Sequence, residues 1–424
     1  MKITHFNLFM VIAVLISLNS CKDKFTKTYQ ANIPIYMDYD EWRNQDLTMQ
    51  AAKTVENPGK LWIKDQYLFI NEPMKGVHVF NNSIPSNPIN IGFIPVISSL
   101  DIAVKGNVLF VDSYTDIISF DITNPEAITM ICRTNDVFKN DKIQTSQGYN
   151  FNIPAIELNA SNGVIIGWEQ QEVTEEAYAS GNYYNSNNNI DGLLAVSDVS
   201  FSNSGGVSTG GSMASFAIYT DYLYVIEGRN INSFHIEGNC LTNSGTLQTQ
   251  NQLETLFTSG GYLYVGTTTG MLIYTLQNTN TPLQVGNYPH VGSCDPVVVQ
   301  GNRAYVTLRT GNACVGDVNQ LVVVNIEDKT NPYEIKTYEM TNPHGLGLDN
   351  NTLFLCDGSD GLKVYDKTDD YTIDSNMISH FQNINTFDVI PYNDVLIMTA
   401  KEGIYQYDYS DVQNITQLSL IPSN

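Results

Sequence analysis

The chain has 424 residues and a formal net charge of −23, and its 21 Lys and Arg residues form no basic block. Such acidity repels phosphate backbones and anionic lipid surfaces, so the sequence argues against nucleic-acid binding. Apolar residues make up 42% of the chain and include 25 Tyr and 17 Phe, enough for a large core that needs no metal to hold it.

The first twenty residues have the pattern of an export signal. Lys2 precedes an apolar run over 6–18 that is too short to cross a bilayer as a helix. The sequence Leu18-Asn19-Ser20-Cys21 is similar to the bacterial lipobox, in which the Cys becomes a lipidated N-terminus. We therefore expect a lipoprotein anchored through Cys21, at the outer membrane because Lys22 stands where Asp would resemble an inner-membrane retention signal. The alternative is an ordinary cleaved secretory peptide followed by a chance Cys.

Residues 21–58 are polar and mixed in character. We expect a tether here, followed by a short helix near 39–49 that packs against the rest of the protein. The aromatic and acidic cluster at 36–43 has a second interpretation as a docking epitope.

The stretch 253–288 shows the plan of the rest of the chain. Four runs rich in apolar, aromatic and β-branched residues are separated by Gly260-Gly261, Thr269-Gly270 and Asn280-Thr281-Pro282, which predicts a four-stranded antiparallel meander. The second run, YLYV, has counterparts beginning at Tyr67, Val108, Tyr222, Arg303, Thr352 and Asp394, and a weaker one at Gly163. Four strands in each unit of about 40 residues predict an all-β fold, a β-propeller. The alternative is a β-sandwich with accidental periodicity.

We count eight four-stranded blades over residues 59–424, or seven if the irregular third unit at 137–211 is not a complete blade. In that unit GVIIGWEQQEV resembles a strand pair, while 179–189 and 202–212 are rich in Gly, Ser and Asn and are expected to be mobile loops. They are either binding loops or an unselected insertion. The last unit, 387–421, supplies four strands of its own, so closure of the ring by an N-terminal strand is not required.

Three segments carry a family resemblance: VHVF from Val77, ISFDITNP from Ile118 and LVVVNIEDKTNP from Leu321. They resemble the repeats of LVIVD-repeat proteins, which are propeller lipoproteins of the bacterial cell envelope. The resemblance covers roughly 59–422. It implies the fold and the location, and it carries over no catalytic residues.

Candidate site residues follow from the geometry of a propeller, because the first strand of every blade lines the central channel. Counting back nine or ten positions from each second run gives Lys60, Asp101, Ala214, Glu254, Asp295 and His344. The loops between second and third strands add Glu72, Asp112, Glu227, Arg309, Asp357, Asp360 and Glu402 on the same face. We expect Lys60, Asp101, Glu254, Asp295 and His344 to bind a ligand at the channel mouth, where crowded carboxylates raise one another's pKa or recruit a cation. The alternative is a water-filled channel with a polar rim.

Two cysteines, Cys294 and Cys314, flank the first two strands of one blade, and we expect them to form a disulfide in an oxidising compartment. Cys356 is the rival partner, and two unpaired thiols are the alternative. Cys132 and Cys240 fall in the outer parts of other blades.

No GxSxG, HExxH or CxxC motif occurs, and the six His residues are dispersed. We therefore expect a monomeric, non-enzymatic binding or scaffold module for an envelope protein or a glycan. The alternative is a periplasmic or surface enzyme that acts on glycans or lactone-like substrates with a divalent cation at the channel mouth. The fold alone does not separate the two.

Overall fold

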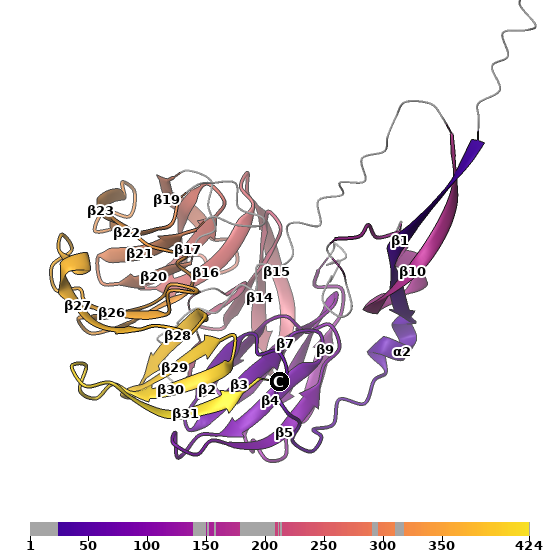
Figure 1. The fold of residues 1–424 in the computed structure, drawn as a ribbon, viewed down its shortest axis with the longest axis horizontal. Coiled ribbons are helices and arrows are strands. Elements are labelled where there is room, and N and C mark those ends of the chain that lie inside the picture. The colour runs from indigo at the N-terminus through magenta and orange to yellow at the C-terminus, as the bar shows by residue number, and fades with distance from the viewer. Residues whose placement is uncertain are drawn as a thin grey trace, which may run out of the picture.

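The computed structural model describes residues 24–138, 150, 152–156, 158–178, 208–210, 212, 214–290, 296–309 and 318–423. Seven antiparallel sheets follow one another around a ring, from indigo to yellow in Figure 1. The first strands of successive sheets contact one another, so they line the central axis. The protein is therefore a seven-bladed β-propeller.

Each blade is built from four strands that are consecutive in the chain. Blade 1 contains β2 (Leu61–Lys64), β3 (Tyr67–Glu72), β4 (Gly76–Asn81) and β5 (Ile89–Pro95). Blade 2 contains β6 (Ile102–Lys105), β7 (Val108–Ser113), β8 (Asp116–Asp121) and β9 (Thr129–Thr134). Blade 3 contains β12 (Phe216–Tyr219), β13 (Tyr222–Glu227), β14 (Asn230–Glu237) and β15 (Cys240–Gln248). Blade 4 contains β16 (Leu253–Ser259), β17 (Tyr262–Thr267), β18 (Gly270–Thr275) and β19 (Leu283–Pro289), which confirms the meander predicted there.

The remaining blades repeat the pattern. Blade 5 contains β20 (Val297–Gln300), β21 (Arg303–Leu308), β22 (Gln320–Asn325) and β23 (Tyr333–Glu339). Blade 6 contains β24 (Leu346–Asp349), β25 (Thr352–Cys356), β26 (Leu362–Asp366) and β27 (Met377–Phe381), with the short helix η2 (Ile373–Asn376) before β27. Blade 7 contains β28 (Thr386–Tyr392), β29 (Val395–Ala400), β30 (Gly403–Asp408) and β31 (Thr416–Pro422).

The prediction of eight blades is wrong, and the alternative of seven is confirmed. The unit at 137–211 forms no blade because its strands pair elsewhere. After the short helix η1 (Ala160–Asn162), β10 (Val164–Tyr178) is one long strand that pairs with β1 (Lys24–Met37). β11 (Ser208–Gly210) adds to the inner edge of blade 1. The expected mobile loop at 202–212 therefore ends in ordered structure, whereas 179–189 lies outside the described residues.

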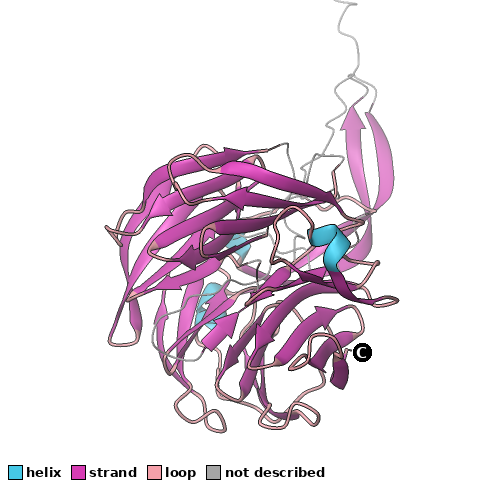
Figure 2. Ribbon diagram, turned by 90° about the vertical axis from the view of Figure 1, so that its left-hand side faces the viewer, coloured by secondary structure: helices cyan, strands magenta, loops and turns pink. Residues whose placement is uncertain are grey.

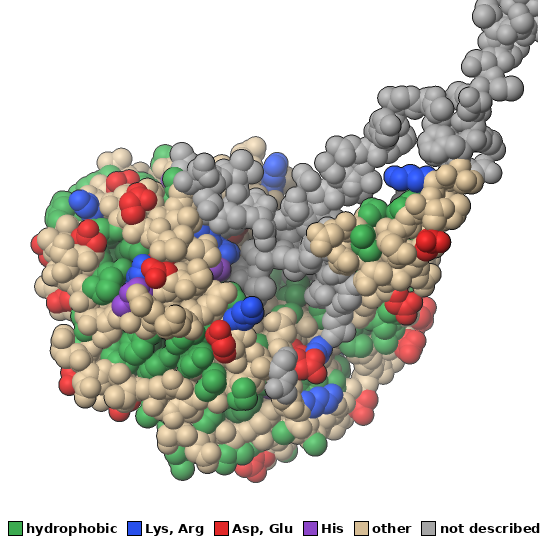
Figure 3. All heavy atoms as spheres, in the orientation of Figure 1, with side chains coloured by type: hydrophobic (Ala, Val, Ile, Leu, Met, Phe, Trp, Pro, Cys, Tyr) green, Lys and Arg blue, Asp and Glu red, His purple; other side chains and the backbone are tan. Residues whose placement is uncertain are grey.

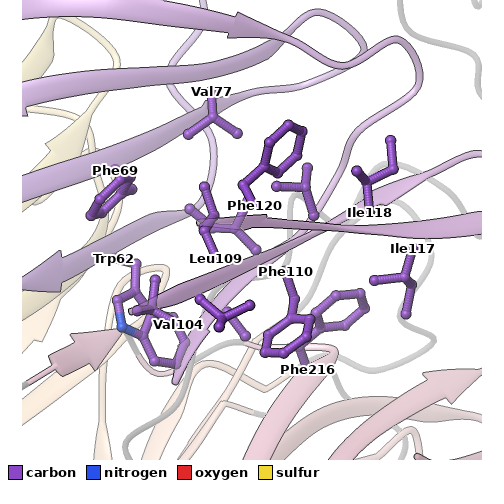
Figure 4. Packing of buried hydrophobic residues seen from close by; sticks show 14 of the residues in the cluster. Trp62, Phe69, Val77, Val104, Leu109, Phe110, Ile117, Ile118, Phe120 and Phe216 are labelled. Atoms are coloured by element: carbon purple, nitrogen blue, oxygen red, sulfur yellow. The ribbon is translucent and has the colours of Figure 1, made fainter. Parts of the chain in front are cut away.

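Packing between blades explains the aromatic residue that recurs at the third position of the second strands. Tyr224 of β13 donates a hydrogen bond from its hydroxyl to the carbonyl of Thr279, 2.9 Å away in the next blade. In the same way, the hydroxyl of Tyr305 in β21 donates a hydrogen bond of 3.4 Å to Asp370 Oδ1 of the next blade. Figure 4 shows the corresponding Phe69 and Phe110 packed in one cluster with residues of blades 1 to 3.

Blade 7 draws all four of its strands from the last unit of the sequence, as predicted, and within the described ranges it meets blade 1 through side-chain contacts. Ile390 and Ile397 of blade 7 share a buried cluster with Leu61 and Leu68 of blade 1. Asn82 and Gln406 exchange two amide hydrogen bonds of 2.8 and 2.7 Å, although 324 residues separate them.

A disulfide joins Cys132 of β9 to Cys240 of β15. Both cysteines lie in outer strands, as expected, and the two strands belong to adjacent blades, so this pairing was missed in the sequence. The disulfide therefore links blades 2 and 3 covalently at the point where the segment 137–211 leaves the ring. Cys294 and Cys314 lie outside the described residues, and Cys356 is buried in β25.

The segment before blade 1 is more ordered than the expected tether. β1 leads into α2 (Tyr39–Arg43), which is shorter than the predicted helix over 39–49. Trp42 of α2 is completely buried, so this residue of the aromatic and acidic cluster packs against the ring. Beyond α2, Gln50 exchanges backbone hydrogen bonds with Phe93 on the outer strand of blade 1. No helix in the described part of the chain is long and apolar enough to cross a membrane.

Candidate functional site

Strand register identifies which residues begin the channel-lining strands. The recurring third residue of each second strand faces a partner in the first strand, as Phe69 faces Trp62 and Phe354 faces Gly347. Two positions before that partner, the seven blades carry Lys60, Asp101, Ser215, Thr255, Pro296, Gly345 and Asp388. These seven residues form a ring, and each lies nine positions before the third residue of the second strand in its blade.

The predicted site coincides with this ring at Lys60 and Asp101 only. Ala214, Glu254 and His344 were counted one residue too far back, and a shift of one residue turns a side chain to the other face of a strand. Glu254 is the extra residue of a β-bulge between Leu253 and Thr255. Asp295 lies outside the described residues.

Lys60 and Asp101 form a buried ion pair that ties three blades together. The ammonium of Lys60 lies 3.5 Å from Asp101 Oδ2, and the two side chains are 4% and 1% exposed. Asp101 Oδ2 also accepts hydrogen bonds from the backbone N–H and the hydroxyl of Ser215, at 2.9 and 2.5 Å. The backbone N–H of Ile102 donates to Asp101 Oδ1. This carboxylate is therefore occupied by contacts within the protein.

The third ionisable member of the ring, Asp388, binds a segment of the protein's own chain. β11 runs antiparallel to β2, with Ser208 opposite Lys64 and Gly210 opposite Trp62, on the side of β2 that faces the axis. Just beyond β11, the completely buried Ser212 donates its hydroxyl to Asp388 Oδ1 at 2.9 Å.

The same hydroxyl accepts a hydrogen bond of 2.9 Å from the backbone N–H of Leu346 in blade 6. β11 and Ser212 thus contact blades 1, 6 and 7 on the inner side of the ring. We call β11 and Ser212 the channel segment. Burial raises the pKa of Asp388 to about 6, against the opposing effects of the Ser212 hydrogen bonds and of Lys60.

Gly345 shows how closely this arrangement is packed. A Cβ at this position would lie 2.0 Å from Asp388 Oδ1 and 2.8 Å from Ser212 Oγ. Only glycine leaves room for the carboxylate and the hydroxyl to meet.

His344 lies apart from the ion pair, between blades 5, 6 and 7. Its Nε2 is 3.2 Å from the amide nitrogen of Asn342 and 3.5 Å from a guanidinium nitrogen of Arg309, and its ring meets Phe387 edge-on. Burial, together with the charge of Arg309, lowers the pKa of His344 to about 3. The imidazole is therefore neutral at physiological pH.

The carboxylates that end second strands hold loops in place. Asp112 accepts hydrogen bonds from the backbone N–H groups of Leu100 and Asp101, in the loop that enters blade 2. Asp357 does the same for Thr341 and Asn342 before blade 6. This shared arrangement explains why acidic residues recur there without implying catalysis.

Two of these carboxylates also pair with basic side chains. Asp357 lies 2.5 Å from the ammonium of Lys363. Glu72 lies 2.7 Å from His78 and 2.6 Å from Lys75. Burial acts to raise the pKa of Glu72, but the hydrogen bonds from His78 and Lys75 outweigh it and lower the pKa to about 2. No group of three His, Cys, Asp or Glu side chains within the described ranges is arranged to hold a metal ion.

Comparison with known proteins agrees with this architecture. The family model of the LVIVD repeat matches residues 306–340, which run from β21 to just beyond β23 in blade 5. No curated protein matches the sequence. A periplasmic gluconolactonase of Pseudomonas aeruginosa has a similar structure, with a TM-score of 0.51 and 11% identity over 87% of this chain and 98% of the other.

Two further solved structures are less similar. The computationally designed Ika8 protein has a TM-score of 0.49 and 8% identity over 88% of this chain and 89% of its own. PorZ, a surface component of the type-IX secretion system of Porphyromonas gingivalis, has a TM-score of 0.47 and 11% identity over 87% of this chain and 38% of its own. At 11% identity, the similarity to the gluconolactonase shows the fold alone.

Proposed function

We propose that this LVIVD-repeat β-propeller is a lipoprotein of the cell envelope that binds a protein or a glycan on the outer surface of its ring, without chemical turnover. The observation that carries the proposal is the channel segment. The concave centre of a ring is the natural place for a small substrate, and here the protein's own backbone and the Ser212 hydroxyl fill part of it. Ligands therefore meet the exposed loops and outer strands.

The charges that line the channel support the same conclusion. Lys60, Asp101 and Asp388 make their contacts within the protein and join neighbouring blades. On the outer surface, acidic side chains are scattered over the face seen in Figure 3 and do not gather in one patch. Such a surface suits a broad contact with a protein or a neutral glycan better than a small charged substrate.

The envelope location is supported by two features. The apolar run over 6–18 followed by Cys21 has the pattern of a lipoprotein signal, which would place the protein at the outer membrane. The disulfide between Cys132 and Cys240 is of a kind that persists in oxidising compartments outside the cytosol.

The test compares binding with turnover. Purified protein is applied to a glycan array and cross-linked to envelope extracts, and it is also incubated with lactones and oligosaccharides while product formation is followed. We expect saturable binding that survives Asp101→Asn and Asp388→Asn, because those residues act inside the ring. Steady formation of a hydrolysis product that either substitution abolishes would overturn the proposal and favour an enzyme with its site in the channel.

The lipid anchor has a separate test. Cys21→Ser should leave an unprocessed precursor or release protein from the membrane fraction, since two or more acyl chains are needed for durable anchoring. Unchanged processing and fractionation in that variant would show that the protein is not a lipoprotein.

A further inference from the structure

The β1–β10 ribbon stands apart from the ring in both views of the fold (Figures 1 and 2). Its two strands pair without interruption from Lys24 opposite Tyr178 to Met37 opposite Val164, with one bulge near the base. We infer that the ribbon is a stiff spacer that holds the ring away from the membrane to which the N-terminus is attached. With β1 14 residues long, the ribbon spans about 45 Å, at about 3.3 Å per residue.

The base of the ribbon is built into folded structure. Ala31 and Asn32 are completely buried, and Trp168 of β10 is nearly so. The side-chain amide of Asn32 donates to the carbonyls of Asn150 and Ile153 at 2.8 and 2.9 Å and accepts from the backbone N–H of Asn150 at 2.9 Å. These bonds hold a third stretch of backbone against the ribbon and stiffen this half.

A short connection, fixed by hydrogen bonds, also joins the ribbon to blade 2. Only Asp38 separates β1 from α2, and its side chain accepts hydrogen bonds from the first backbone N–H groups of the helix. Trp42 of α2 donates from its indole N–H to the Ser113 hydroxyl. Arg43 makes two hydrogen bonds, of 3.1 and 3.0 Å, to the buried carboxylate of Asp116. The direction of the ribbon is therefore coupled to that of the ring.

The outer half of the ribbon carries polar side chains that are exposed to solvent. Thr26, Lys27, Thr28 and Gln30 of β1 are all exposed. Lys27 lies opposite Glu175, a pairing of opposite charges that favours the sheet, and the hydroxyls of Thr28 and Thr174 share a hydrogen bond of 2.9 Å. Charged residues on both strands also discourage a further strand from adding to the edges. This half neither packs on the ring nor suits insertion into lipid.

The order of the chain places the membrane at the free end of the ribbon. This step rests on the lipid attachment proposed above. If Cys21 carries the acyl chains, only Lys22 and Asp23 separate it from β1, a reach of about 10 Å at most. The pairs from Lys24 to Gln30 add about 23 Å of paired strand. The height of the ring is therefore set by the ribbon and not by a flexible tether.

Shortening the ribbon tests the inference. Deleting Thr26–Tyr29 together with Val173–Glu176 removes four facing pairs and keeps the alternation of faces, because the number is even. In the lipidated, full-length protein on a supported bilayer, neutron reflectometry should show the ring about 13 Å closer to the membrane than in the parent. The double substitution Lys27→Ser and Glu175→Ser serves as the control, since it removes the pairing of opposite charges but keeps the ribbon's length and net charge, and should leave the height unchanged.

The outcomes separate the two proposals. An unchanged height in the deletion variant, or a broad distribution of heights in the parent, would overturn the spacer while leaving the lipid anchor intact. Parent protein that does not attach to the bilayer would overturn the anchor, and the spacer with it. Both variants are first compared with the parent by thermal unfolding, because a ring that melts at the parent's temperature shows that only the ribbon has changed.

Discussion

Replacing both Cys132 and Cys240 with Ser should lower the free energy of unfolding by about 2–5 kcal/mol. The bond joins β9 to β15 across a separation of 108 residues. The other blades that follow one another in the chain are joined by short connections, such as the one from Pro95 to Ile102. Blades 2 and 3 alone are separated by the long excursion that begins after β9. The disulfide therefore links blades 2 and 3 covalently where no short connection does so.

The magnitude follows from the entropy of the unfolded chain. A cross-link that closes a loop of this length removes conformational freedom equivalent to about 4.8 kcal/mol at 25 °C. Some contact between the blades survives without the bond, because the Thr134 hydroxyl still reaches the carbonyl of Leu241 at 3.5 Å. The ring should therefore stay closed in the variant but unfold more easily.

Denaturant unfolding under non-reducing conditions measures the difference. Adding a phosphine reductant to both proteins should abolish the difference in stability between the parent and the double variant. Thr129→Ser, an exposed change on the same strand as Cys132, is the matched control and should alter stability by less than about 0.5 kcal/mol. Equal stability of parent and double variant, with both thiols open to alkylation in the folded parent, would refute the reasoning.

Further predictions concern the channel and the N-terminal segment. Gly345→Ala should cost about 1–3 kcal/mol, because the new Cβ collides with the Asp388 carboxylate; thermal unfolding checks this, and a stability equal to the parent's would contradict the packing. Burial raises the pKa of Asp388 to about 6, above its unfolded value, so the folded state retains the proton longer and the parent should lose stability between about pH 4 and pH 7 relative to Asp388→Asn. Urea unfolding of both proteins across that pH range measures the difference in the free energy of unfolding. A parent that gains stability with rising pH relative to the variant would show that the charge of Lys60 outweighs burial in setting the pKa of Asp388. Trp42→Ala should expose the N-terminal segment to limited proteolysis and cost about 3–5 kcal/mol, and unchanged cleavage would contradict its anchoring role.

The blades were predictable because each is a local unit with its own turns. The second strands were recognisable because an aromatic residue recurs at their third position. That residue recurs because it packs against the next blade. The same signal misled at 137–211. There Val164, at the start of the apolar run, is buried against Trp42 and Tyr114 and not within a blade. A sequence pattern does not distinguish these two kinds of burial.

The channel residues were predicted only in part, because a count of positions has to be correct to one residue. In blade 7 the repeated run begins at Val395 and not at Asp394, so the alignment was displaced by one and Asp388 was missed. A uniform count of nine finds Ser215, and it finds Asp388 once the run in blade 7 starts at Val395. No count would have found Ser212, since the pairing of β11 with β2 joins segments about 145 residues apart by tertiary contacts alone.

Hydrogen exchange of the channel segment tests the account most directly. The structure buries Ser212 against Asp388 and Leu346 and pairs β11 with β2, so the backbone amides of Ser208–Gly210 and Ser212 should exchange as slowly as those of β2 itself. Exchange at the rate of an unstructured chain would contradict the account. The channel would then be open, and the ring of Lys60, Asp101 and Asp388 would again be the place to look for a ligand.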